Sequence, residues 1–122
     1  NVEQHIHFLD VCAWVMGDKY PAKAIGMGGR SVLTGTEYGN IYDHFSVVYE
    51  YANGTRLVSN TRQHPKTKGD LSARVLGSSG QALLSERTNG LTIKSEKLDW
   101  VFEGDSGDMY QTEHNELFAS IR

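Results

Sequence analysis

The stretch His44-Phe-Ser-Val-Val-Tyr-Glu-Tyr-Ala-Asn-Gly-Thr-Arg-Leu-Val-Ser-Asn-Thr61 decides the fold of this chain. In its first half the odd-numbered positions, from Phe45 to Tyr51, are apolar or aromatic, which is the period-2 pattern of a strand with one buried face. Asn53-Gly54 follows at once, and this pair favours a two-residue type I′ turn in which both residues have positive φ. The stretch therefore predicts a β-hairpin whose second strand covers residues 55–61.

Further short strands are predicted on both sides of this hairpin, because short apolar runs alternate there with turn-forming clusters such as Gly77-Ser78-Ser79-Gly80. The strands are expected over residues 22–26, 44–51, 55–61, 73–76, 81–85, 91–94 and 99–103. The fold class is therefore α+β, with a mostly antiparallel, open-faced sheet of about five to seven strands. At 122 residues the chain is expected to form a single domain.

A helix is predicted at each end of the sheet. The first covers residues 3–16, with Ile6, Leu9, Ala13 and Met16 as its apolar stripe and Gly17 as its C-terminal stop. The second covers residues 109–121, with Asp108 as its N-cap. Its Tyr110, Leu117, Phe118 and Ile121 share one side, so we expect both helices to pack on one face of the sheet and a partner to cover the other.

Composition excludes several classes of function. The formal net charge of −3 offers no basic surface for nucleic acid, and the longest apolar run, residues 11–16, is far shorter than the roughly 20 residues of a membrane span. The single cysteine, Cys12, excludes an internal disulfide. Gly26-Met27-Gly28-Gly29 would need glycine in place of Ser31 to match the dinucleotide fingerprint, so we interpret it as a bend or bulge in a strand and expect no cofactor-binding residues here.

Candidate chemistry lies on the first helix. Glu3, His7, Asp10 and Trp14 follow the helical period and share one side. A carboxylate one turn before an imidazole can fix its tautomer, which suits a general acid or base acting on a hydroxyl, although such a pair is also common on protein surfaces.

Metal binding is not expected. His5 and His7 diverge by about 200° on a helix, so they cannot chelate one ion together with a distant His44 or His64, and His5 is expected to be exposed. Tyr42, His44 and Arg62 stand at strand ends or loop edges and are candidates for gripping sugar hydroxyls, or they are ordinary surface residues of the sheet.

Several segments, in order along the chain, resemble the Gfo/Idh/MocA family of oxidoreductases. They are Glu3-Gln-His-Ile-His7-Phe-Leu-Asp10 with Trp14 and Gly17-Asp18, then Gly28-Gly29-Arg30, Gly39-Asn-Ile-Tyr42-Asp43-His44-Phe45, Tyr49-Glu-Tyr-Ala-Asn-Gly54, and Tyr110-Gln-Thr-Glu-His-Asn-Glu-Leu-Phe118. The resemblance covers most of the chain. The first segment matches the family pattern D-x-x-x-H-x-x-D except that Glu3 replaces aspartate, which puts the contacts of that carboxylate in doubt.

The resemblance implies a dihydrodipicolinate-reductase-like C-terminal domain, spanning residues 1–122, for substrate binding and oligomerisation. NAD or NADP would be bound by a Rossmann domain outside this chain, and the chain alone would bind no cofactor. His7 would transfer the proton of a sugar or polyol hydroxyl, with Glu3 beside it and Asp10 contacting substrate. The open sheet face would form a homo-oligomer. Because the chain begins at Asn1, almost inside a helix, we expect a piece of a longer protein that has no dehydrogenase activity by itself.

Two alternatives remain open from the sequence. One is a non-catalytic sugar-binding or dimerisation module, since such folds can lose their chemistry. The other is an NAD-dependent glycosidase of related architecture, in which the bound nicotinamide is recycled.

Overall fold

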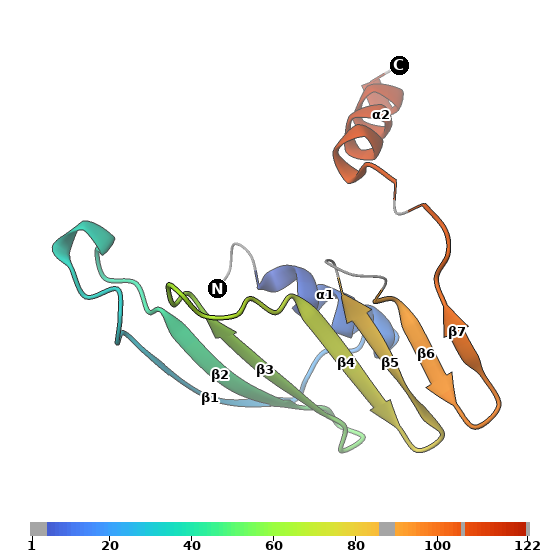
Figure 1. Cartoon of the computed structure of the whole chain (residues 1–122), viewed down its shortest axis with the longest axis horizontal. Coiled ribbons are helices and arrows are strands. Elements are labelled where there is room, and N and C mark those ends of the chain that lie inside the picture. Colours follow the sequence, from blue (N-terminus) through green and yellow to red (C-terminus); the bar gives the residue numbers. More distant parts are fainter. Residues whose placement is uncertain (1–4, 86–89, 106, 122) are drawn as a thin grey trace. The chain divides into compact units, whose positions relative to one another are not determined.

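The computed structural model describes residues 5–85, 90–105 and 107–121. Within them the chain has α+β architecture, as predicted, and every predicted strand is present within a few residues (Figure 1). The elements are α1 (Ile6–Val15), β1 (Lys23–Gly29), the 3₁₀ helix η1 (Thr36–Tyr38), β2 (His44–Glu50), β3 (Arg56–Arg62), β4 (Ser72–Gly77), β5 (Gly80–Ser85), β6 (Thr92–Ser95), β7 (Asp99–Val101) and α2 (Met109–Ile121).

The described strands form two sheets rather than the single sheet expected. The first has the order β1-β2-β3 and is antiparallel throughout. The second has the order β4-β5-β6-β7, with antiparallel β5–β6 and β6–β7 pairs. The chain divides into two compact units, residues 1–73 and 74–122, and each is described by itself.

The β2–β3 hairpin is confirmed, but its predicted turn type is wrong. The Tyr51 amide donates to the Thr55 carbonyl and the Gly54 amide donates to the Tyr51 carbonyl, both over 2.9 Å, so the loop contains three residues, 52–54. Only Gly54 has a positive φ, at 84°, whereas a type I′ turn also requires one at Asn53. The Asn53 side chain instead accepts a hydrogen bond from the Thr55 amide over 3.0 Å, which stabilises this longer turn.

The glycines of β1 belong to a regular strand, so the predicted bend or bulge is wrong. Pairing with β2 runs without interruption from Lys23 to Gly29. A Cβ added at Gly26 would lie 2.9 Å from Val47 Cγ2, and one at Gly28 would lie 2.8 Å from Phe45 Cδ1. The glycines therefore leave room for two side chains of β2.

Helix α1 packs on one face of the first sheet, which we call the helix face. Residues paired across antiparallel strands share a face, so Val47 and Ser59 both belong to it. His5 Nε2 lies 2.5 Å from Ser59 Oγ. Burial raises the pKa of Tyr51, and the nearby Cys12 thiol raises it further, so Cys12 also lies on this face of the sheet. Among the hydrophobic residues that the structure describes, Tyr51 is the buried one, with 6% of its surface exposed.

Two predictions about α1 are therefore wrong. His5 was expected to be exposed, but it is partly buried against Ser59. Ile6 was expected in the buried stripe, but it is 46% exposed. The partly buried positions are His5, Phe8, Leu9, Val11, Cys12, Ala13 and Met16. The side of the helix that faces the sheet therefore includes His5, whose imidazole contacts the Ser59 hydroxyl.

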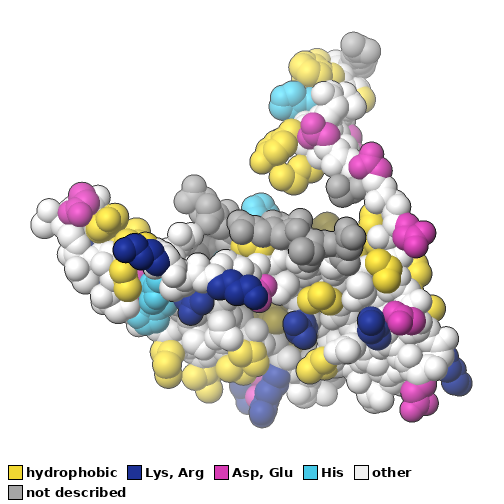
Figure 2. Space-filling model, viewed as in Figure 1, with side chains coloured by type: hydrophobic (Ala, Val, Ile, Leu, Met, Phe, Trp, Pro, Cys, Tyr) yellow, Lys and Arg dark blue, Asp and Glu magenta, His cyan; other side chains and the backbone are white. Residues whose placement is uncertain are grey.

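The opposite side of the first sheet, which we call the open face, carries exposed apolar side chains. Ile25, Val48 and Val58 form one row across the three strands, and Met27 follows in the next row. Ile25 is 80% exposed and Met27 is 78% exposed. Figure 2 shows hydrophobic side chains on the surface of this part of the molecule.

The predicted helix ends are confirmed where the structure describes them. Gly17, with φ 67°, and Asp18 close α1 through bonds from their amides to the carbonyls of Trp14 and Ala13. Asp108 Oδ1 caps α2 by accepting from the amides of residues 110 and 111.

Helix α2 has no buried residue among those that the structure describes. All its described residues are exposed, including Leu117 and Phe118, so the joint packing of both helices on one sheet face stays a prediction. Neither described helix has the length and apolar character of a membrane span.

Candidate functional site

A buried carboxylate lies where β2 begins. Asp43 is 1% exposed, and its Oδ2 accepts hydrogen bonds from three successive backbone amides, those of Ser31, Val32 and Leu33, over 2.9, 2.6 and 2.9 Å. Successive amides that converge on one anion form a backbone nest. The segment after β1 is therefore folded around the Asp43 side chain.

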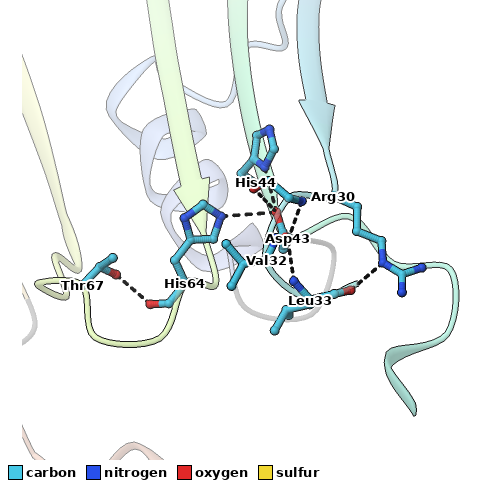
Figure 3. A network of polar contacts seen from close by, with 8 residues as sticks. Arg30, Val32, Leu33, Asp43, His44, His64 and Thr67 are labelled. Atoms are coloured by element: carbon cyan, nitrogen blue, oxygen red, sulfur yellow. Dashed lines mark hydrogen bonds and ion pairs between the residues drawn. The ribbon is translucent and has the colours of Figure 1, made fainter. Parts of the chain in front are cut away.

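Arg30 also stabilises the loop between β1 and β2. The guanidinium donates to the carbonyls of Leu33, Gly35 and Gly39, over 2.5, 2.7 and 2.6 Å. A single planar group thus binds three loop carbonyls, which fixes the loop that carries η1. Figure 3 shows Arg30 directed toward Leu33 rather than toward Asp43.

Two histidines face the second oxygen of Asp43, as Figure 3 shows. His44 Nδ1 lies 2.7 Å and His64 Nε2 lies 3.2 Å from Asp43 Oδ1. The two imidazole rings meet edge to face with centroids 5.8 Å apart. The His44 side chain is 41% exposed and that of His64 is 23% exposed, so the imidazoles separate a buried carboxylate from solvent.

The Asp43 carboxylate stays ionised. Burial raises its pKa, but the amides of Leu33 and Val32, the His44 side chain and the Ser31 amide donate to it and hold the pKa well below its usual range. An ionised carboxylate only accepts hydrogen bonds, so both imidazoles must donate to it while no other cation is present.

The β2–β3 pairing places this cluster, which we call the Asp-His-His cluster and which consists of Asp43, His44 and His64. The Gln63 amide donates to the Asp43 carbonyl over 2.8 Å, so Asp43 and His64 are brought together by the hairpin. The Thr67 hydroxyl then donates to the His64 carbonyl over 2.8 Å and closes the loop after β3.

The candidate residues of α1 are exposed. His7 and Asp10 lie on the solvent side of the helix together with Trp14, as the helical spacing predicts. Glu3 lies outside the described residues, so its contact with His7 stays a prediction. The other reactive group of the helix is unsuited to nucleophilic chemistry, because burial raises the pKa of the Cys12 thiol.

The structure divides the three candidates on the strands between two sides of the sheet. His44 and Arg62 are direct partners across β2 and β3, and they share a face with Met27 rather than with Ser59. They therefore lie at one end of the open face, away from α1. Tyr42 lies just before β2 and its ring contacts Phe45, a helix-face residue, with ring centroids 5.7 Å apart.

Sequence reasoning did not single out Asp43, His64 or Arg30 as one arrangement. A partial signal was present, because the predicted hairpin brings residues 43 and 44 opposite residues 62–64, and the observed three-residue loop, centred on Asn53, pairs residue 44 with residue 62. Extending that register by one residue places Asp43 opposite residue 63 and next to His64. The nest and the bonds of Arg30 depend on the path of the loop over residues 31–42, which no periodic pattern encodes.

Comparison of the chain with family models, with curated proteins and with solved structures found no match.

Proposed function

We propose that this chain is the substrate-binding domain of an NAD(P)-dependent oxidoreductase of the Gfo/Idh/MocA type, acting on a sugar, a sugar derivative or a polyol. The observation that carries the proposal is the exposed pair His7 and Asp10 on a helix anchored to the sheet. The sequence resemblance supplies the reaction class. In this proposal NAD or NADP is bound by another domain of the full-length protein.

The direction of α1 supports a site at one end of the helix face. His5 contacts Ser59, whereas Cys12 lies near Tyr51 at the hairpin end of the strands. The N-terminal part of α1 therefore points toward the end of the sheet where Tyr42 and the Asp-His-His cluster lie. We therefore propose that His7 and Tyr42 belong to one site.

His7 is the proton-transfer residue of this proposal. An exposed imidazole can accept the proton of a substrate hydroxyl while hydride leaves the same carbon for the nicotinamide. Asp10 lies about one turn further along the helix and can accept a hydrogen bond from a neighbouring hydroxyl. Tyr42 offers an aromatic face and a hydroxyl for the sugar ring. His44 and Arg62 lie at the same end of the sheet but belong to its open face, so they are not assigned to this group.

The proposal is tested by screening the full-length protein against sugars and polyols while following nicotinamide absorbance. We expect at least one substrate to give stoichiometric reduction or oxidation of NAD or NADP. Hydrolysis of a glycoside without net change of the cofactor would instead establish the recycling glycosidase. Sugar binding with neither reaction, in a protein that lacks a dinucleotide-binding domain, would establish the non-catalytic module.

The open face is proposed as a homo-oligomer contact, because its exposed row of Ile25, Val48 and Val58 forms an apolar strip on the sheet. Introducing a charge there, as Ile25→Glu, is expected to weaken self-association by about 100-fold or more, since the charge would be buried at the contact. Sedimentation velocity over a concentration series measures the effect.

Leu76→Glu is the matched control for this experiment, because Leu76 is 78% exposed on β4 of the second sheet and Ile25 is 80% exposed. We expect the Leu76 variant to associate like the unchanged chain. Equal association of all three proteins, or a wild-type chain that is monomeric at every concentration, would contradict the proposed contact.

A further inference from the structure

The Asp-His-His cluster has the chemistry of a transition-metal site. Two imidazole nitrogens and one carboxylate oxygen are the donors that zinc and its first-row neighbours prefer, whereas magnesium and calcium prefer sets made only of oxygen. The ligand atoms of Asp43, His44 and His64 all lie within 4.8 Å of one another.

The distances from the Asp43 carboxylate to the two imidazoles are close to those between ligands that share one ion. Ligands about 2.0–2.1 Å from a tetrahedral zinc lie about 3.3 Å from each other. Asp43 Oδ1 lies 3.2 Å from His64 Nε2 and 2.7 Å from His44 Nδ1. The ligand nitrogens of the two imidazoles lie within 4.8 Å of each other, so they would need to close by up to about 1.5 Å to meet at one ion. The partly exposed His44 has room to make that movement.

The carboxylate is oriented in the way that metal-ligating carboxylates are. Its Oδ2 is occupied by the three amides of residues 31–33, which fix the group and direct Oδ1 toward the imidazoles. Hydrogen bonds of this kind from outside the ligand set commonly orient the ligands of metal sites. The carboxylate itself therefore requires little reorganisation to receive an ion.

Charge also favours a cation at this position. A buried carboxylate is costly unless it is paired, and the ion pairs of Asp43 within the described residues are with His44 and His64. Arg30, the nearest arginine in sequence, donates to loop carbonyls instead. A divalent ion would neutralise the carboxylate directly and leave both imidazoles uncharged.

We propose that Asp43, His44 and His64 bind one divalent transition-metal ion, with Zn²⁺ the preferred occupant. Three protein ligands leave a fourth position for water or another ligand, and the exposed side of the cluster, at His44, provides access for the ion. The proposal does not depend on the oxidoreductase assignment, since it rests on the three side chains alone.

The test uses the untagged chain, freed of metal with EDTA and titrated with ZnCl₂ by calorimetry, then with CoCl₂ while visible absorption is followed. We expect one Zn²⁺ per chain and Co²⁺ bands typical of low coordination number, with no displacement by excess Mg²⁺. His64→Gln removes one ligand without removing the buried carboxylate, and it is expected to weaken zinc binding by at least about tenfold.

His114→Gln is the matched control, because His114 is an exposed histidine on α2. It should bind zinc like the unchanged chain, and circular dichroism should show that both variants are folded. Absence of stoichiometric zinc binding would overturn the proposal. Zinc binding that survives both His64→Gln and His44→Gln without loss of affinity would overturn it as well.

Discussion

Replacing Asp43 by alanine is expected to lower the thermal midpoint of the chain by on the order of 10 °C. The substitution removes the acceptor of three backbone amides and of two imidazoles at once. Buried donors left without a partner are among the few causes of large losses in stability. Differential scanning calorimetry of the metal-free chain measures the change.

Two variants make this experiment specific. Asp70→Ala is the control, because Asp70 is exposed and accepts a hydrogen bond from the Ser72 hydroxyl, and it should shift the midpoint by no more than about 2 °C. Asp43→Asn keeps one acceptor oxygen but turns amide hydrogens toward donors, so an intermediate loss is expected. An Asp43→Ala midpoint equal to that of Asp70→Ala would show that the nest does not stabilise the fold.

The strands and helices could be predicted because their patterns are local. Alternation over residues 44–51 and the Asn53-Gly54 pair predicted the hairpin, and Asp108 and Gly17 predicted helix ends that the structure confirms. The turn type was wrong because Asn53 uses its side chain to bond the Thr55 amide instead of adopting a positive φ.

Features that depend on which side of the sheet is covered could not be predicted in the same way. The stripe on α1 was misjudged because His5 finds a partner in Ser59, 54 residues away in the sequence. The separation of His44 from the helix face follows from strand register, which fixes the side of the sheet on which each candidate lies. The Asp-His-His cluster required both that register and the path of the loop that Arg30 and Asp43 hold.

The structure shows where the candidate residues of α1 lie, but it does not test their proposed roles. His7 and Asp10 are exposed on the same side of the helix, as expected, and an exposed side chain can be replaced with little effect on stability. A change in activity after such a replacement therefore reports on chemistry rather than on folding. This makes His7 the most informative residue for the proposed function.

The measurement that tests the proposed function most directly is the kcat of the full-length protein carrying His7→Ala, with the substrate found by screening. Loss of a general acid or base lowers rates by about 100-fold to 10,000-fold, so we predict that kcat falls by at least about 100-fold while the thermal midpoint stays unchanged. His114→Ala, an exposed helical histidine outside the proposed site, should keep kcat within about threefold of the unchanged protein. A His7→Ala protein that turns over NAD or NADP as fast as the His114→Ala control would contradict the account.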